Sequence, residues 1–107
     1  MKEKTEHSAL TEAVYYILLS LYQPMHGYGI MQNIKELSNG RVSMGAGTLY
    51  GAINTLQDKG WIIPVPNEEN SRKKEYQITE TGKLMVKLEI ARLEELLKNG
   101  HDILGGE

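Results

Sequence analysis

The chain has 107 residues, of which 40% are hydrophobic and 24% charged, and this length gives room for one domain with one core and one extra helix. The absence of cysteine excludes disulfides and thiolate metal sites, and the formal net charge of −2 argues against a protein that coats nucleic acid without sequence preference. With no membrane-length apolar run and no signal-peptide layout, we expect a soluble, cytoplasmic protein whose nucleic-acid contacts, where it makes any, come from a local cluster of cations.

The chain begins with a polar stretch, residues 1–7, which is predicted to be a flexible N-terminal arm. A domain over residues 8–78 follows. Its first helix can be capped by Ser8 or Thr11, and its apolar residues recur at helical spacing. The helix ends near Pro24, because a proline biases the preceding residue away from helical angles.

A second helix is expected to begin near His26 or Gly27 and to end at Asn39-Gly40, where glycine suits a left-handed C-terminal cap. His26 is assigned a capping or structural role, because His7 and His101 have no ligand spacing to it, so no metal site is predicted. The buried side of this helix is predicted to consist of Tyr28, Ile30, Met31, Ile34 and Leu37.

A third helix, over residues 45–60, is predicted to have two different faces. Leu49, Ile53 and Leu56 recur at the spacing of a buried stripe. The opposite side carries small or polar groups where Glu and Lys are usual: Thr48, Tyr50, Gly51, Asn54 and Thr55. Such a front suits close approach to another hydrogen-bonding surface, for example base-pair edges in a major groove. A surface helix of small residues explains the same pattern, and this stretch alone leaves both interpretations open.

Beyond the third helix the pattern changes to that of a hairpin, with strands at residues 61–65 and 75–78. Arg72, Lys73 and Lys74 form a basic shoulder on it. Three cations are also common at a solvated strand end. Beside a helix with a polar front, however, they fall where the wing of a winged helix meets a phosphate backbone.

A last helix is predicted over residues 79–98, followed by a flexible tail over 99–107. It carries two apolar stripes, one of Leu84, Leu88 and Ala91, the other of Val86, Ile90, Leu93 and Leu97. A helix that is apolar on two sides has to bury both, and a domain of this size has little core to offer. We therefore assign Val86, Ile90, Leu93 and Leu97 to contact between the subunits of a homodimer, the alternative being burial of both stripes within one monomer.

Three blocks of the sequence resemble the signature blocks of the PadR family of bacterial transcriptional regulators: residues 26–30 (His-Gly-Tyr-Gly-Ile), 47–50 (Gly-Thr-Leu-Tyr) and 72–82. The resemblance implies a mainly α fold with a small β-hairpin, namely a winged helix-turn-helix with a C-terminal dimerisation helix, as in the short branch of the family. It also implies a dimeric repressor of a palindromic double-stranded DNA operator, with the third helix in the major groove and the wing beside it.

Carried over by residue, the resemblance implies groove contacts for Thr48, Tyr50, Gly51 and Asn54 and wing contacts for Arg72, Lys73 and Lys74. Two features depart from the family pattern. Gly45-Ala46 stands where many members have Ser-Pro, which gives a weaker cap. Lys59 is the only cation of the third helix, so binding should lean on the wing and on Lys35 or Arg41, with Asn54 a candidate for reading adenine.

Some similar regulators bind planar drugs or phenolic compounds between subunits through aromatic residues that include a tryptophan on the last helix. Here no aromatic residue follows Tyr76, so an effector pocket would have to draw on Tyr15, Tyr16 and Met85. The sequence leaves open whether an inducer exists, and it implies no cofactor.

Two other classes of function compete with this interpretation. An enzyme is excluded, because the sequence holds no nucleophile with a base, no spaced histidine pair and no phosphate-binding glycine pattern. The other rival is a winged-helix module that binds protein and not DNA. Exposed large apolar residues on the third helix and the wing would favour that module, whereas the small polar and basic set favours DNA.

Overall fold

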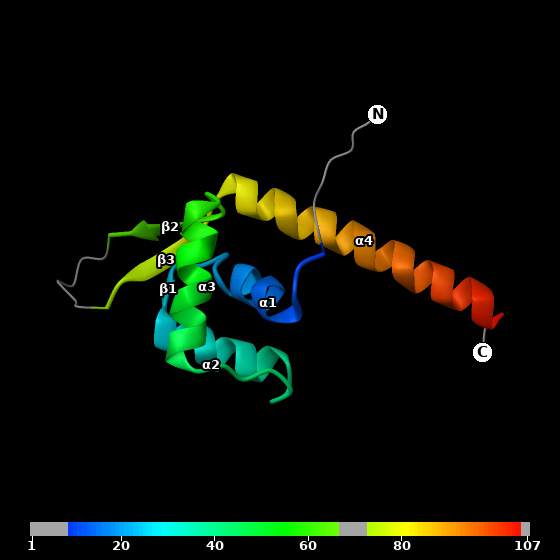
Figure 1. Cartoon of the computed structure of the whole chain (residues 1–107), viewed down its shortest axis with the longest axis horizontal. Helices are drawn as coiled ribbons and strands as arrows, with labels where there is room; N and C mark the ends of the chain where they lie inside the picture. The colour runs from blue at the N-terminus through cyan, green and yellow to red at the C-terminus, as the bar shows by residue number, and fades with distance from the viewer. Residues whose placement is uncertain (1–8, 67–72, 106–107) are drawn as a thin grey trace.

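The computed structural model describes residues 9–66 and 73–105. The elements in chain order are α1 (Glu12–Ser20), β1 (Met25–His26), α2 (Gly27–Leu37), α3 (Ala46–Asp58), β2 (Ile62–Val65), β3 (Glu75–Ile78) and α4 (Glu80–Leu104). Helices α1 to α3 pack together, the small sheet lies at one end of them, and α4 leaves the domain as a long arm (Figure 1). The predicted class, mainly helical with a small wing-like sheet, is confirmed.

Three of the four described helices begin with a side-chain cap, and the caps of α1 and α2 are residues that the sequence offered for this role. The caps are Thr11, His26 and Thr79, which accept hydrogen bonds from the backbone N–H of Val14 at 3.1 Å, Gly29 at 3.3 Å and Gly82 at 3.1 Å. Helix α3 starts at Gly45 without a side-chain cap, so its first turn is the least fixed of the four. Its stability therefore depends on packing.

One hydrophobic core takes buried residues from α1 to α4 and from β2 and β3, and Met25 of β1 packs against it. Helix α3 contributes Leu49, Ile53 and Leu56, each at most 2% exposed, which confirms its predicted buried stripe. The other core residues are Ile17, Leu18, Leu21, Ile30, Ile34, Ile62, Tyr76, Ile78 and Val86. The core thereby fixes α3 from behind and leaves its other side outside.

The buried side of α2 differs in part from the prediction. Ile30 and Ile34 are buried as expected, together with Gly27. Tyr28 is 62% exposed, because it lies two positions from Ile30 and so points about 200° away around the helix. Leu37, the last residue of the helix, is 48% exposed.

The sheet has three antiparallel strands in the order β1-β3-β2, one more than the predicted hairpin. Strand β2 pairs with β3 from Ile62 opposite Ile78 to Val65 opposite Glu75. The additional strand β1 pairs Met25 with Tyr76 and His26 with Glu75. Its two residues are too few to show strand periodicity, yet they attach the start of α2 to the wing.

Helix α4 is longer than predicted. The expected end at residue 98, with a flexible tail from 99, is wrong for residues 99–104, which are helical. A glycine inside a helix costs only about 1 kcal/mol, so Gly100 does not end it, and Lys98 Nζ lies 2.7 Å from Asp102 Oδ2 across this turn. The helix ends at Gly105, whose φ of 71° gives the left-handed cap. Within the described ranges, no helix combines the length and apolarity needed to cross a membrane.

The side of α4 that faces the domain consists of Gly82, Val86 and Glu89. Val86 is 2% exposed and belongs to the core, which corrects its assignment to the dimer contact. Glu89 is also buried, and its Oε1 accepts the backbone N–H of Leu10 at 3.2 Å while Arg92 Nη2 donates to its Oε2 at 2.6 Å. These contacts fasten the start of the domain to the arm.

The first turn of α4 lies close against the backbone of Trp61, just before β2, and we predict that this contact requires glycine at position 82. A Cβ on Gly82 would lie 2.3 Å from the backbone oxygen of Trp61, whereas a Cβ on Gly51, in α3, would meet nothing within 4 Å. We expect Gly82→Ala to lower the free energy of unfolding by about 1–3 kcal/mol. The matched control Gly51→Ala should raise it by about 0.5–1 kcal/mol, because alanine is the better helix former. Urea titrations at one protein concentration measure both, and equal effects would contradict the close contact.

Candidate nucleic-acid interface

The exposed side of α3 carries the small and polar residues that the sequence predicted there. Thr48, Gly51, Asn54 and Thr55 are all exposed, and the hydroxyl of Thr55 donates to the backbone oxygen of Gly51 at 3.3 Å. A Cβ on Gly51 would meet nothing within 4 Å. This surface, which we call the α3 front (Thr48, Gly51, Asn54 and Thr55), therefore offers hydrogen-bonding groups with open space before them.

Sequence analysis missed one residue on this side of α3. Asp58 is exposed and lies seven positions after Gly51, which places it close to the same line along the helix. The signal was available in the sequence, because 51, 55 and 58 follow the four-then-three spacing of one helix face. A carboxylate there adds an acceptor at the end of an otherwise neutral surface.

Tyr50 lies on the flank of α3 and not at the centre of the front. A Cβ on Gly27 would come within 2.1 Å of the Tyr50 hydroxyl oxygen, so the phenol rests directly over the start of α2. Burial raises the pKa of the Tyr76 phenol above its usual value, and the neighbouring Tyr50 adds to the shift. Tyr50 thus joins α3 to α2 and to β3.

An open hollow of about 380 Å³ lies where these elements meet. We call it the wing-root hollow, and its lining residues are His26, Gly27, Tyr28, Tyr50, Lys73, Lys74 and Tyr76. It unites residues from three separate stretches of sequence, including three that were predicted to touch nucleic acid: Tyr50, Lys73 and Lys74. The third cation of the basic shoulder, Arg72, lies outside the described residues.

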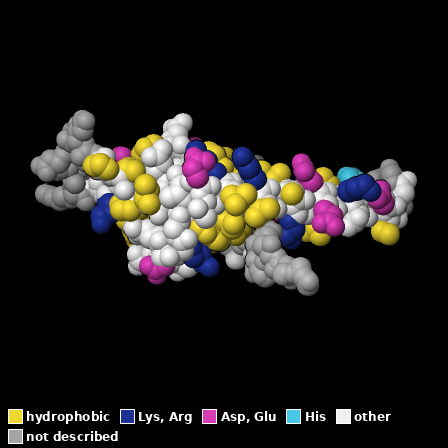
Figure 2. All heavy atoms as spheres, turned by 90° about the horizontal axis from the view of Figure 1, so that it is seen from above, with side chains coloured by type: hydrophobic (Ala, Val, Ile, Leu, Met, Phe, Trp, Pro, Cys, Tyr) yellow, Lys and Arg dark blue, Asp and Glu magenta, His cyan; other side chains and the backbone are white. Residues whose placement is uncertain are grey.

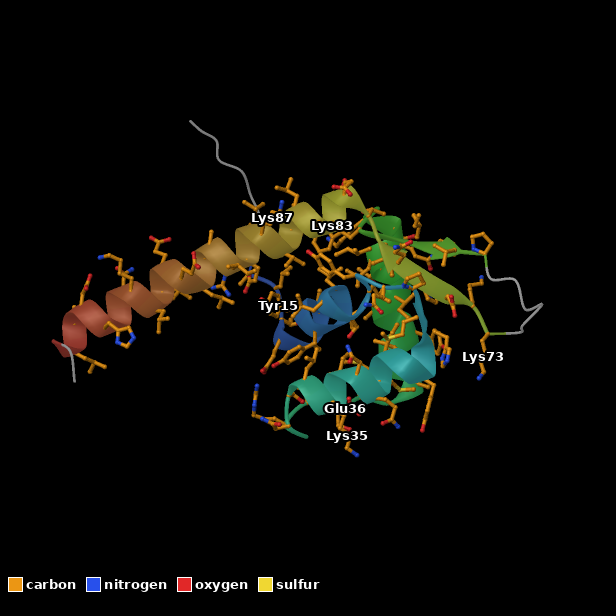
Figure 3. All side chains as sticks on the ribbon, turned by 180° about the vertical axis from the view of Figure 1, so that it is seen from behind. Tyr15, Lys35, Glu36, Lys73, Lys83 and Lys87 are labelled. Atoms are coloured by element: carbon orange, nitrogen blue, oxygen red, sulfur yellow. The ribbon has the colours of Figure 1, made fainter. Side chains whose placement is uncertain are left out.

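The other two predicted cations do not line the wing-root hollow. Arg41 forms a two-pronged ion pair with Glu12, with 3.0 Å between its Nη1 and Oε1 of the carboxylate. This hydrogen bonding lowers the pKa of Glu12 and raises that of Arg41. Lys35 is exposed at the outer side of α2 next to Glu36, well apart from Lys73 at the wing (Figure 3). The DNA contacts of Lys35 and Arg41 remain predictions, and the ion pair with Glu12 offsets the charge of Arg41.

Of the three residues named for an effector, two belong to α1 and one to α4. Tyr15, Tyr16 and Met85 are all partly buried, and the rings of Tyr15 and Tyr16 are 6.2 Å apart between centroids. Burial, and secondarily the charge of Glu89, raises the pKa of Tyr15. Figure 3 shows Tyr15 on the side of α1 toward α4. None of the three lines the wing-root hollow.

The described parts of the chain hold no group of three or more histidine, aspartate or glutamate side chains arranged for a metal ion. The chemistry that the described surface offers is therefore hydrogen bonding from α3 and positive charge at the wing. Neither requires a bound cofactor.

Comparison with known proteins gives related folds and sequences. A transcriptional regulator from Clostridium thermocellum superposes with a TM-score of 0.70 at 25% identity, over 85% of this chain and 90% of that one. A PadR family transcription regulator from Clostridium difficile has the same fold, with a TM-score of 0.72 at 20% identity over 88% of this chain and 99% of its own. An uncharacterised protein in a transposon of Streptomyces fradiae is 35% identical over 66 residues, which are 62% of this chain but only 18% of that protein.

Residues 15–88 match the family described as "Transcriptional regulator PadR-like family". The matched range runs from α1 through the wing into the first third of α4, so it includes the α3 front and the wing-root hollow. Members of this family are transcriptional regulators and not enzymes, in agreement with the exclusion of catalysis from the sequence. Because the match covers more than half of the chain, the chain belongs to the PadR-like family of transcriptional regulators.

Proposed function

We propose that the protein is a sequence-specific DNA-binding regulator that acts as a dimeric repressor on a palindromic operator. The observation that carries this proposal is the α3 front, a neutral exposed surface of small and polar groups, flanked by the lysines of the wing-root hollow. The front enters the major groove and the wing meets the adjacent phosphates. Family membership supports the proposal.

The side chains of the α3 front suit base edges better than a protein partner. Asn54 can form two hydrogen bonds with adenine, and a threonine hydroxyl can donate to or accept from a base edge while its methyl contacts a thymine methyl. Gly51 lets the helix backbone approach closely. A protein-binding module would expose large apolar residues here, but in α3 the exposed large hydrophobic residue is Tyr50, which rests over Gly27.

The arm formed by α4 supports dimerisation. Val86, Ile90, Leu93, Leu97 and Leu104 follow alternating spacings of three and four when Gly100 is included, which is the pattern of a coiled-coil seam. We call the part of this line beyond the core the α4 seam (Ile90, Leu93, Leu97, Gly100 and Leu104). The line starts in the core at Val86, and the α4 seam continues it past the domain, where Leu93 and Leu97 are 40% and 61% exposed. Figure 2 shows hydrophobic side chains where α4 meets the domain and further ones along the arm.

The occupant proposed for this seam is the same seam of a second copy. The exposed residues continue a line that is already buried at its first position, so a second helix can extend the core along the arm. Two domains held this way present two copies of α3, which matches the two half-sites of a palindrome. Release of the operator by a small molecule would use Tyr15 and Tyr16 of α1 and Met85 of α4, all of which are partly buried.

Sequencing the genomic DNA fragments that the purified protein retains tests the proposal as a whole. We expect a few enriched sites with inverted repeats whose centres are about one helical turn, 10–10.5 base pairs, or a multiple of it apart. Retention of no duplex even at low ionic strength would overturn the proposal and favour the protein-binding module.

The wing lysines should determine the salt dependence of binding. We expect the double change Lys73→Ala and Lys74→Ala to weaken binding to all duplexes and to flatten the slope of log K against log salt by about 1–2, because each lost phosphate contact removes about 0.9. Lys87→Ala, which removes an exposed cation from α4, is the control and should change neither value. An unchanged slope in the double variant would remove the wing from the interface.

Asn54 should contribute sequence preference and little general affinity. We expect Asn54→Ala to relax selectivity at one base position of each half-site by about 1–3 kcal/mol. Selection from a randomised duplex pool, compared between the variant and the parent protein, measures this. Identical base profiles would reject a contact between Asn54 and a base.

The α4 seam should hold the dimer. We expect Leu93→Lys combined with Leu97→Lys to give a monomer, because two cations would have to be buried in the seam. The matched control Ile103→Lys changes a residue of the same arm that is 86% exposed and lies off the seam, so it should remain dimeric. Light scattering gives the molar mass of each variant and circular dichroism shows that the helices are kept. A dimeric double variant would contradict this interface.

A further inference from the structure

The wing-root hollow is lined by the two lysines of the predicted wing contact and also by residues of β1, α2, α3 and β3. We propose that it binds one backbone phosphate of the duplex, held jointly by α2, α3 and the wing. This inference rests on the proposed function and adds to it a defined phosphodiester site beside the α3 front.

The lining of the hollow favours an anion. Lys73 and Lys74 bring two positive charges, and none of the residues that line it carries a carboxylate. Tyr28 and Tyr50 add phenol groups. The Tyr28 hydroxyl accepts a hydrogen bond from Gln32 Nε2 at 2.8 Å, which leaves its own O–H available to donate. Charge-assisted hydrogen bonds of these kinds are the strong ones for phosphate oxygens.

The position of the hollow favours a phosphate of DNA over a free anion. Tyr50 precedes Asn54 by four residues, about 6 Å along α3, so the hollow lies directly beside the front. A duplex that offers its major groove to the front must carry its backbone past one flank of the helix. The hollow is open and not enclosed, which suits a phosphate that stays attached to a chain on both sides.

Gly27 sets the shape of the site. Since a Cβ there would lie 2.1 Å from the Tyr50 hydroxyl oxygen, only glycine lets the phenol rest at the start of α2. His26 caps α2 at the same point, and the positive end of the helix dipole adds to the field of the lysines. Helix α2 thus contributes to a contact that the sequence assigned to the wing and α3 alone.

Single neutral methylphosphonates, placed one at a time along a retained operator duplex, test this inference. For the parent protein we expect one position per half-site at which the substitution lowers affinity about tenfold. Lys74→Gln and Tyr50→Phe should each weaken binding to the unmodified duplex. With these variants, the same methylphosphonate should cause little further loss, because the contact is already gone. Tyr50→Phe keeps the ring over Gly27 and removes only the hydroxyl.

The control Lys87→Gln should bind the unmodified duplex as the parent does and should show the same sensitive position. Additive losses at every position for both Lys74→Gln and Tyr50→Phe would overturn the inference. If base preference still depended on Asn54 in that case, the proposed function would stand and only the phosphate site would fail. If no duplex were retained at all, both would fail.

Titration of the DNA-free protein with inorganic phosphate separates the two sources of the anion. At constant ionic strength, we expect only weak shifts of the Gly27 and Lys74 amide resonances at millimolar phosphate. Saturation at micromolar phosphate, with no methylphosphonate-sensitive position in the duplex, would assign the hollow to a free phosphorylated compound and overturn the DNA assignment.

Discussion

Leu49, Ile53 and Leu56 of α3 pack into the core, and this contact fixes the rotation of the helix about its axis. Burial of each side chain contributes about 1.5–3 kcal/mol, so turning α3 by one residue would cost several kcal/mol. No side-chain cap holds the start of this helix, so its orientation depends on the apolar stripe. Because the apolar stripe has to stay in the core, the α3 front on the opposite side of the helix is exposed.

The same core explains why the wing and α3 form one surface. Tyr76 and Ile78 of β3 are buried with the α3 stripe, while β1 attaches the start of α2 to the other edge of β3. Tyr50 closes the junction over Gly27. A change in the position of the wing would therefore move the walls of the wing-root hollow. Packing, and not the chain connection alone, thus fixes the position of the two lysines relative to α3.

Sequence reasoning found the features that repeat locally. The caps Thr11 and His26, the α3 stripe and the two longer strands each have a signal within a few residues. It missed β1, which is too short for a period, and the hollow, whose walls come from stretches up to fifty residues apart. The assignment of Val86 to the dimer contact was wrong for a similar reason. The regular apolar spacing of the last helix does not show where the domain ends and the arm begins.

The two proposed tasks of the surface are attraction of the duplex by the wing and reading of bases by the α3 front, and only the wing carries positive charge. The chain as a whole has a net charge of −2, and the α3 front has no cation, so in the proposed complex attraction to a duplex would come from few positions and discrimination from neutral groups. One domain with so few phosphate contacts would hold DNA weakly at physiological salt. In the proposed dimer, joining two domains through the α4 seam would make the second contact intramolecular, and the effective concentration of the second α3 would compensate for the few cations of each domain. The exposed arm would thus supply, through dimerisation, the affinity that the neutral α3 front cannot supply through charge.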